Sequence, residues 1–314
     1  EGDSGNVDGF GGHANKETST GNIFRGCRAW NNGDDGFDLI NCYASYIIEY
    51  CWSFRNGYKP HSIESSGGNG AGFKSGGYGM GDIKKVPNPI PQHTVRYCLA
   101  YYNRQQGFYS NHHLGGLIFE NNTAYKNPSN YNMLNRKSSN EAVDVPGYGH
   151  IIKNNLSLSP RNSGGFPQHL INVDNTLSEI KNNSFAPNDL NLSESDFESL
   201  NEQELMGSRK SDGSLPDINF LRLTNHANFR FSGMGCFINE EAVDYSWIQE
   251  PAIVLENGVA RIVGEDSKSF NKFYVNGEEV SIENGIVDLT SMSGELNLKA
   301  ISENGAVTTL IINK

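Results

Sequence analysis

A short segment recurs along the first 185 residues, and this repetition limits what the chain can fold into more than any other feature. Each copy has an apolar residue three positions before a Cys or Asn and a small residue two positions after it. The central Cys or Asn positions are Cys27, Cys51, Cys98, Asn122, Asn155 and, more weakly, Asn183. The shortest steps, from 27 to 51 and from 98 to 122, are 24 residues. Such a period of short alternating segments predicts a solenoid of stacked parallel strands.

We interpret this solenoid as an all-β, right-handed parallel β-helix. Equivalent residues of successive rungs then lie about 4.8 Å apart. Cys27, Cys51 and Cys98 would form an inward column that Asn122 and its successors continue, with side-chain amides hydrogen-bonded along the stack. The five cysteines show neither CxxC nor Cys/His metal spacing, so we expect a structural role for them. Leucine-rich repeats have a similar period, but the leucine pattern is missing.

A Gly-Phe pair is the second repeated element. It occurs with Phe10, Phe37, Phe73 and Phe108, and we expect the Phe side chains to point inward while Gly allows the bend into the strand. The residue after the pair varies in charge: Asp38, Lys74 and Tyr109 would occupy one outward column on successive rungs. Three unlike polar side chains on one exposed face indicate a site.

Four aspartates gather at the start of this column. If the register holds, Asp8 stacks near Asp35, with Asp34 and Asp38 close by. Carboxylates at that range repel one another unless one is protonated or a cation joins them. Carboxylates without Cys or His suit Ca²⁺ better than zinc, although Asp34 and Asp35 could also form a plain polar turn. A divalent cation nearby disfavours the ammonium form of Lys74, which could then act as a neutral base at mildly alkaline pH.

The remainder of the chain has a different character. Residues 190–215 are polar and predict a loop or helix that covers the solenoid. From about residue 237 strands alternate with Asn-Gly turns, which predicts a β-sandwich. We therefore expect a catalytic β-helix over residues 1–230 and an accessory β-sandwich over residues 231–314.

Charge and hydropathy limit the partners. The net charge of −11 argues against nucleic acid. No apolar run approaches the roughly 18 residues of a membrane helix. We expect a secreted, monomeric protein whose signal peptide has been removed.

Four segments together resemble the pectate and rhamnogalacturonan lyases of polysaccharide lyase family nine. They span residues 6–10, 29–40, 69–77 and 121–127, within a resemblance that covers about residues 1–185. The resemblance implies Ca²⁺-assisted β-elimination at a galacturonate of an acidic plant cell-wall polysaccharide, with Lys74 as the base. It also implies that Ca²⁺ is held by Asp8, Asp34, Asp35 and Asp38.

The chain departs from the family around Tyr109, where the pectate lyases have an acidic residue. We expect Tyr109, Asn111, His112 and His113 to bind substrate, and this aromatic and imidazole-rich segment suits a partly neutral saccharide such as rhamnogalacturonan I. These residues could equally line a rung, and polygalacturonate remains the alternative substrate. The chain also begins only a few residues before Asp8, the first of the four site aspartates, so we expect it to lack upstream rungs.

Two other functions remain open. A β-helical hydrolase of the polygalacturonase kind also uses clustered aspartates, but would need neither Ca²⁺ nor Lys74. A carbohydrate-binding solenoid with a structural Ca²⁺ site fits the repetition alone.

Overall fold

The computed structural model describes residues 6–78, 86–161, 168–237, 251–256, 258–264, 267–283, 285–303 and 305–314. It divides into two compact units. The first is Glu1–Thr224 with Met234–Ile238, and the second is Asn225–Gly233 with Asn239–Lys314. Within the described ranges, no helix has both the length and the apolar character needed to cross a membrane.

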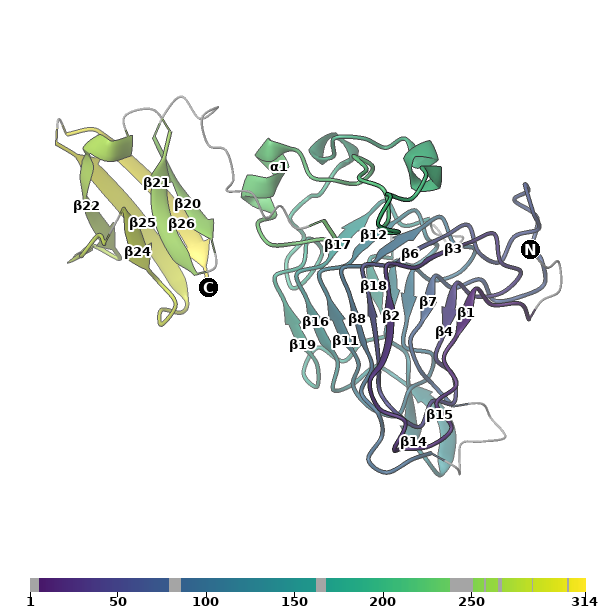
Figure 1. The fold of residues 1–314 in the computed structure, drawn as a ribbon. Coiled ribbons are helices and arrows are strands. Elements are labelled where there is room, and N and C mark those ends of the chain that lie inside the picture. Colours follow the sequence, from purple (N-terminus) through teal and green to yellow (C-terminus); the bar gives the residue numbers. More distant parts are fainter. Residues whose placement is uncertain are drawn as a thin grey trace. The chain divides into compact units, whose positions relative to one another are not determined.

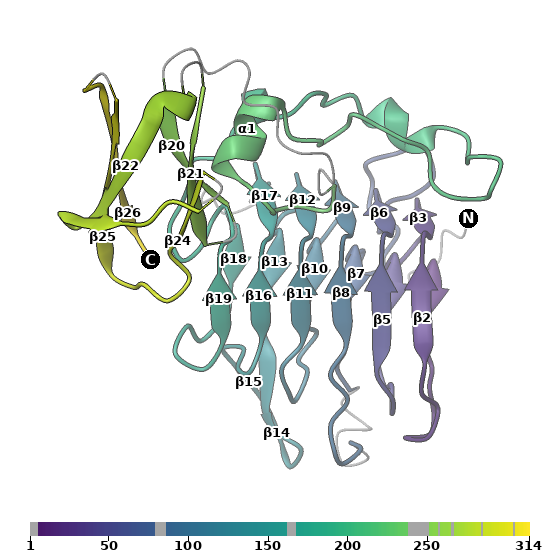
Figure 2. The ribbon, with the colours of Figure 1, turned by 60° about the vertical axis from the view of Figure 1, so that its left-hand side comes forward.

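Three parallel sheets run along the first unit (Figures 1 and 2). Sheet A contains β1 (Phe10–Gly11), β4 (Phe37–Asp38), β7 (Phe73–Lys74), β10 (Phe108–Tyr109), β13 (Tyr131–Asn132) and β18 (Leu170–Ile171). Sheet B contains β2 (Asn22–Arg25), β5 (Tyr46–Glu49), β8 (Thr94–Arg96), β11 (Ile118–Glu120), β16 (Ile151–Lys153) and β19 (Glu179–Lys181). Sheet C contains β3 (Arg28–Trp30), β6 (Trp52–Phe54), β9 (Leu99–Tyr101), β12 (Thr123–Tyr125) and β17 (Leu156–Leu158). The parallel β-helix is confirmed.

The Gly-Phe pairs build the apolar interior of this helix. The rings of Phe10, Phe37, Phe73, Phe108 and Tyr131 stack along the axis, with successive centroids 4.9–5.0 Å apart. This spacing is that of neighbouring strands. The inward orientation expected for the Phe side chains is therefore confirmed: the rings of Phe37, Phe73, Phe108 and Tyr131 are fully buried, and Phe10 at the end of the stack is partly buried.

The Cys and Asn column is also confirmed. The backbone N–H of Cys27 donates to Sγ of Cys51 over 3.3 Å. Further along, Asn122 Nδ2 donates to Asn155 Oδ1 over 3.1 Å, and Asn155 Nδ2 donates to Asn183 Oδ1 over 2.9 Å. Because these groups are buried, each amide satisfies the next one where no water reaches.

The structure contains a second asparagine column that was not predicted from the sequence. Side-chain amides donate in turn from Asn32 to Asn56, from Asn56 to Asn103, from Asn103 to Asn127 and from Asn127 to Asn130, over 2.8–3.0 Å. Its signal in the sequence is an Asn two positions after the aromatic residue that ends a repeat. This column holds the bend between sheet C and sheet A, just before the strands that carry the candidate site.

The polar segment after the last rung covers sheet C, as expected (Figure 1). It contains the short 3-10 helices η2 (Glu194–Asp196) and η3 (Glu202–Met206). Arg28 Nη1 donates to the carbonyl of Leu205 over 2.6 Å, and Arg55 Nη2 lies 2.6 Å from Glu202 Oε1. The segment is thus tied to the solenoid by polar contacts.

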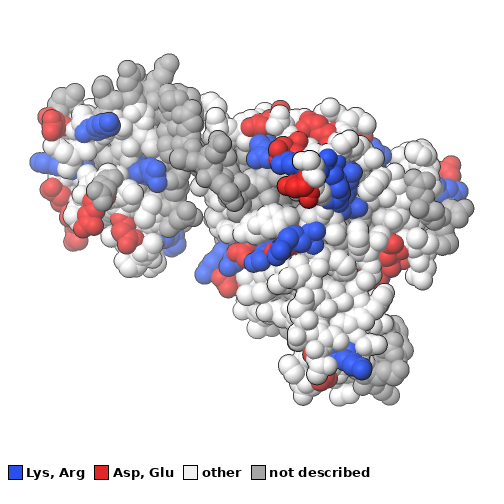
Figure 3. Space-filling model, in the orientation of Figure 1, with Lys and Arg blue, Asp and Glu red and all other residues white. Residues whose placement is uncertain are grey.

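Charged side chains form ion pairs along the outer face of sheet B. Glu49 pairs with Arg25 on one side and Arg96 on the other, and Lys153 pairs with Glu120 on later rungs. Figure 3 shows Lys and Arg side chains in a line over this face. Since the cations already have acidic neighbours, this face is a solvated surface and not a row of free cations.

The second unit is an antiparallel β-sandwich. One sheet contains β20 (Ala252–Glu256), β21 (Val259–Val263) and β24 (Ile286–Asp288). The other contains β22 (Phe270–Val275), β23 (Glu278–Val280), β25 (Glu295–Ser302) and β26 (Val307–Asn313). The remaining elements are helix α1 (Asn225–Arg230) and the 3-10 helix η4 (Ser267–Ser269). Side chains from both sheets form one core, which includes Ala260, Phe273 and Leu298. The β-sandwich is confirmed.

Candidate active site

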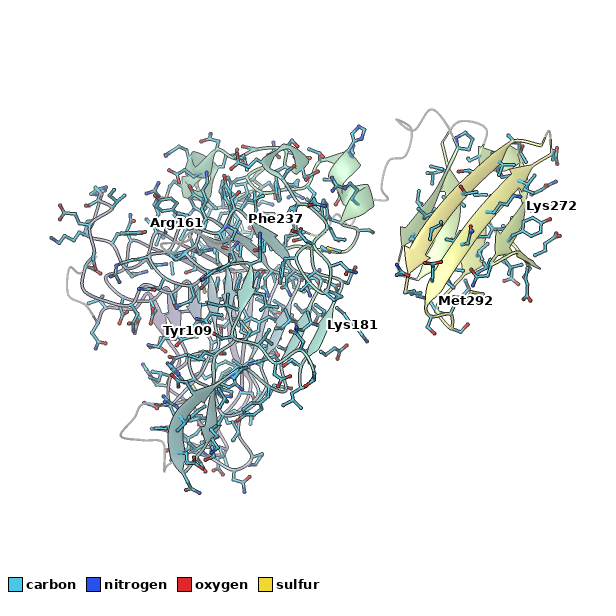
Figure 4. The ribbon with its side chains drawn as sticks, turned by 180° about the vertical axis from the view of Figure 1, so that it is seen from behind. Tyr109, Arg161, Lys181, Phe237, Lys272 and Met292 are labelled. Atoms are coloured by element: carbon cyan, nitrogen blue, oxygen red, sulfur yellow. The ribbon has the colours of Figure 1, made fainter. Side chains whose placement is uncertain are left out.

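One outward column crosses sheet A. Asp38 on β4 is the register partner of Lys74 on β7, Lys74 is the partner of Tyr109 on β10, and Tyr109 is the partner of Asn132 on β13. The expected column of Asp38, Lys74 and Tyr109 is therefore confirmed. Figure 4 labels Tyr109 on this side of the β-helix.

Glycine immediately before each Phe lets the rungs approach closely at this column. A Cβ atom on Gly72 would lie 2.7 Å from the carbonyl oxygen of Gly107 and 2.7 Å from Asn103 Nδ2. Both distances are shorter than any tolerated carbon contact, so a side chain would push the rungs apart. The Gly of the repeated pair thus maintains the spacing between Lys74 and its neighbours.

Three of the four predicted aspartates come together. The carboxylates of Asp8, Asp35 and Asp38 each offer an oxygen within 4.8 Å of the others. Asp34 turns elsewhere: its Oδ1 accepts the backbone N–H of Asn69 over 2.6 Å. Among the residues that the structure describes, Asp34 therefore supports the adjoining loop and does not belong to the group formed by the other three carboxylates.

Backbone donors orient two of these carboxylates toward Lys74. Asp35 Oδ1 accepts the N–H of Ala71 over 2.7 Å, and Asp38 Oδ1 accepts the N–H of Ile40 over 2.7 Å. The other oxygens face the lysine, whose Nζ lies 3.0 Å from Asp35 Oδ2 and 2.9 Å from Asp38 Oδ2. Burial alone would lower the pKa of Lys74, but the charges of Asp35 and Asp38 outweigh it and raise that pKa.

Burial and mutual repulsion disfavour the ionised forms of two carboxylates in the acidic group. Burial raises the pKa of Asp35 to about 7, with Lys74 opposing the rise and Asp34 and Asp38 adding to it. Burial, followed by the charge of Asp38, also raises the pKa of Asp8. Oδ2 of Asp35 is buried without a well-aligned hydrogen bond among the described residues, even though the Lys74 ammonium lies close. A buried, crowded set of hard oxygen donors fits a Ca²⁺ ion.

The expected substrate-binding segment divides into two parts. Tyr109 and His112 are partly exposed, and Tyr109 Oη lies 2.9 Å from His112 Nε2. His113 is completely buried: its Nδ1 accepts the N–H of Gly77 over 3.0 Å and its Nε2 lies 2.9 Å from the carbonyl of Pro91. His113 therefore belongs to the interior and is not placed to contact a substrate.

Asn111 also has a structural contact. Its Nδ2 donates to the carbonyl of Gly76 over 2.7 Å, and the side chain is almost completely buried. Its backbone is left-handed, with φ of 53°, a conformation that Asn tolerates better than most residues. Asn111 thus links two rungs beside the column.

Two further polar residues reach the site from a hairpin that sequence reasoning did not place there. Strands β14 (Asn135–Ser138) and β15 (Glu141–Val145) pair antiparallel, with Arg136 opposite Asp144. Asp144 Oδ1 lies 2.7 Å from His112 Nδ1 and 3.1 Å from Arg136 Nη1. No repeat position marks Asp144, so only the return of the hairpin reveals it.

Comparisons with known proteins agree with this geometry. The family model described as "Pel9A-like, right handed beta helix region" matches residues 1–184, and the one described as "Rhamnogalacturonan lyase-like, C-terminal" matches residues 174–309. A solved structure titled "Rhamnogalacturonan lyase" is 55% identical, with a TM-score of 0.67, and the match covers 74% of this chain and 55% of that one. The crystal structure of pectate lyase Pel9A is 35% identical, with a TM-score of 0.52, over 69% of this chain and 47% of that one.

Curated relatives point the same way. "Pectate lyase L" of Dickeya chrysanthemi is 35% identical over 240 residues, which is 76% of this chain and 48% of the relative. "Pectate lyase PEL9" of Emericella nidulans is 28% identical over 68% of this chain and 50% of the relative. The chain spans about half the length of these curated relatives. With a right-handed β-helix model matching residues 1–184, the chain belongs to the Pel9A-like proteins of polysaccharide lyase family nine.

Proposed function

We propose that this chain is a secreted, Ca²⁺-dependent lyase that cleaves the galacturonate-containing backbone of pectin by β-elimination. The observation that carries the proposal is the position of Lys74, a member of the outward column whose Nζ lies 2.9–3.0 Å from two carboxylates of the acidic group. A potential base and a potential cation site are thus adjacent. The names of the matched lyases support the same reaction class.

Asp8, Asp35 and Asp38 would hold the Ca²⁺ ion, and Asp34 remains a predicted fourth ligand. A bound Ca²⁺ would neutralise the charge that raises the pKa of Lys74 and would draw electron density from the substrate carboxylate, making the C5 proton more acidic. The cation would also let an acidic protein bind a polyanion.

Lys74 acts as the base in this proposal. In its neutral form, Nζ takes the C5 proton, the C5–H electron pair forms the C4=C5 double bond, and the C4–O4 bond breaks with its electrons on oxygen. The product is a 4,5-unsaturated uronide. Burial lowers the pKa of Lys74, but the charges of Asp35 and Asp38 outweigh it, so the neutral form would depend on a cation that offsets those charges. The fixed place of Lys74 between Asp35 and Asp38 orients Nζ on the column face.

The acidic group suits a shared cation better than a hydrolase. One oxygen each of Asp8, Asp35 and Asp38 lies within 4.8 Å of the other two, so the three carboxylates could bind one ion together. An inverting glycoside hydrolase holds its two carboxyl groups about 6.5–9.5 Å apart to leave room for a water. Such a mechanism gives no role to Lys74, which lies between Asp35 and Asp38.

For the substrate we favour rhamnogalacturonan I over polygalacturonate. Beyond Lys74 the column continues with Tyr109 and Asn132, which are neutral. A polymer with a carboxylate on every residue would need a cation there, because a buried carboxylate without a partner is costly. The solved rhamnogalacturonan lyase at 55% identity supports the same preference. A cell-wall polymer as substrate also supports our expectation of secretion.

The test is paired kinetics on both polymers at mildly alkaline pH with added Ca²⁺. Formation of the conjugated alkene is followed in the ultraviolet, and we expect a higher kcat/KM on rhamnogalacturonan I. A tenfold preference for polygalacturonate, about 1.4 kcal/mol of transition-state binding, would overturn the substrate assignment alone. Saccharide binding without alkene formation on either polymer would instead favour a non-catalytic solenoid.

A further inference from the structure

Tyr109, His112 and Asp144 form a hydrogen-bonded line that ends beside Lys74. Tyr109 Oη lies 2.9 Å from His112 Nε2, and His112 Nδ1 lies 2.7 Å from Asp144 Oδ1. The buried Arg136 contacts the same oxygen of Asp144, with Nη1 at 3.1 Å, and donates to the carbonyl of Ala142 over 3.0 Å. The line thus joins strand β10 to the β14–β15 hairpin.

The chemistry of each atom limits what this line can do. An ionised Asp144 only accepts hydrogen bonds, so His112 carries a proton on Nδ1. Nε2 then accepts the hydrogen bond of the Tyr109 hydroxyl, and this contact orients the phenol. Tyr109 is the register partner of Lys74 on the neighbouring rung.

Elimination needs two proton transfers, and Lys74 accounts for one of them. The C5 proton ends on Lys74 Nζ, while the leaving oxygen O4 needs a proton of its own. Strand neighbours are about 4.8 Å apart, so Tyr109 is one rung from the base, along the column face. This rung also carries the hydrogen-bonded line described above.

We propose that Tyr109 is the proton donor to the leaving oxygen and that His112 and Asp144 are positioning residues that orient its hydroxyl, a role that rests on the proposed lyase function. As the C4–O4 bond breaks, O4 takes the hydroxyl proton of Tyr109, and Tyr109 is left as a phenolate. The Nδ1 proton of His112 stays on the imidazole, hydrogen-bonded to Asp144. Lys74 has gained one proton and Tyr109 has lost one, so exchange with water restores both.

The environment of Tyr109 suits this role. Burial, reinforced by the charge of Asp144, raises the pKa of Tyr109 to about 12. The hydroxyl therefore stays protonated until a strongly basic oxygen develops next to it, as happens at O4 during elimination. General acids of this kind contribute about 10²–10⁴ in rate.

The test uses a leaving group that needs no proton. A rhamnogalacturonan oligosaccharide is prepared with fluorine in place of O4 on the terminal galacturonate, so that fluoride leaves as an anion. We expect Tyr109→Phe to lower kcat on the natural polymer by about a hundredfold or more, but to stay within about fivefold of the wild type on the fluoride substrate. Lys74→Gln should lose both activities, because both need a base.

Further variants distinguish a positioning role of His112 and Asp144 from a general structural effect of substitution in this region. We expect Asp144→Asn and His112→Gln to lower kcat on the polymer at least tenfold with little change in KM, and to spare the fluoride substrate. Glu141→Gln, which alters an exposed pair with Lys137 on the same hairpin, is the matched control and should behave as the wild type. Unchanged melting temperatures would confirm that the isosteric variants fold.

The outcomes distinguish this role from the lyase function itself. An equal loss on both substrates for Tyr109→Phe, or no loss on the polymer, would overturn the proton-donor role while leaving Lys74 and the elimination intact. A wild-type protein that forms no unsaturated product from either substrate would overturn the proposed lyase function, and with it the role of Tyr109.

Discussion

Lys74 Nζ lies 2.9 Å from Oδ2 of Asp38, its register partner on the neighbouring strand. The proposed base and a proposed cation ligand are thus consecutive members of one column. The charge of Asp38 contributes to the raised pKa of Lys74, and the lysine lies against Asp38 as its counter-charge. Changes at either residue are expected to affect both metal binding and proton abstraction.

Lys74→Arg tests whether this position needs a base or only a positive charge. A guanidinium keeps the ion pairs with Asp35 and Asp38, but its pKa above about 12 prevents it from taking a proton at working pH. We expect alkene formation to fall at least a thousandfold, as in Lys74→Ala, while saccharide binding is retained. Initial rates and calorimetric binding check this, and an arginine variant with appreciable turnover would contradict it.

Asp35→Asn tests the cation site. The substitution keeps the volume but removes a buried charge from a group of three carboxylates, so we expect the Kd for Ca²⁺ to rise at least tenfold. Calorimetric titration of the chelator-treated protein measures this. Asp212→Asn removes an exposed carboxylate that caps a turn at Ser214 and serves as the control. Equal Ca²⁺ affinity of Asp35→Asn and the wild type would place the cation elsewhere.

The raised pKa of Asp35 predicts an inverted pH dependence of stability without Ca²⁺. Between pH 4 and 7 the unfolded chain ionises this carboxyl, whose ordinary pKa is 3.8, whereas the folded protein holds it protonated up to about 7. The folded state binds more protons, so the free energy of unfolding falls as pH rises. Lys74 is charged in both states throughout this window and adds no slope.

We expect the free energy of unfolding to fall by roughly 2–4 kcal/mol across this window, because each pH unit between the unfolded and folded pKa of Asp35 corresponds to about 1.36 kcal/mol. Urea unfolding at pH 4.5 and 7.5 in a chelator measures it. Asp35→Asn should flatten the slope, and saturating Ca²⁺ should stabilise the protein at the higher pH. A wild-type midpoint that rises with pH in the same chelator would contradict the assignment.

Asn56→Ala tests the second asparagine column. The Asn56 side chain accepts from Asn32 and donates to Asn103, so its removal leaves buried amides on both sides unsatisfied. Each such group costs about 1–3 kcal/mol, and we expect a total loss of about 2–5 kcal/mol. Thermal unfolding checks the loss against Asn140→Ala, an exposed position in the β14–β15 turn. Equal melting temperatures for the two variants would show that the column contributes little.

The repeat predicted the rungs because a fixed offset in sequence becomes a fixed step in space once strands pair in parallel. That is why the Phe stack, the Cys and Asn column and the line from Asp38 through Lys74 to Tyr109 could be derived from residue order alone. The same periodicity predicted the covering segment and the sandwich only as changes of pattern. It could have revealed the second asparagine column, whose spacing is equally regular.

Tertiary structure decided what lies at the bends, where side-chain direction depends on backbone conformation and not on period. Asp34 turned to the N–H of Asn69, away from the other carboxylates. The adjacent histidines separated because His112, with φ of 57°, faces Tyr109 while His113 enters the interior. Asp144 reached the site only because an antiparallel hairpin returns beside the column. Contacts made by such a return have no fixed offset in the sequence, so residue order alone could not place them.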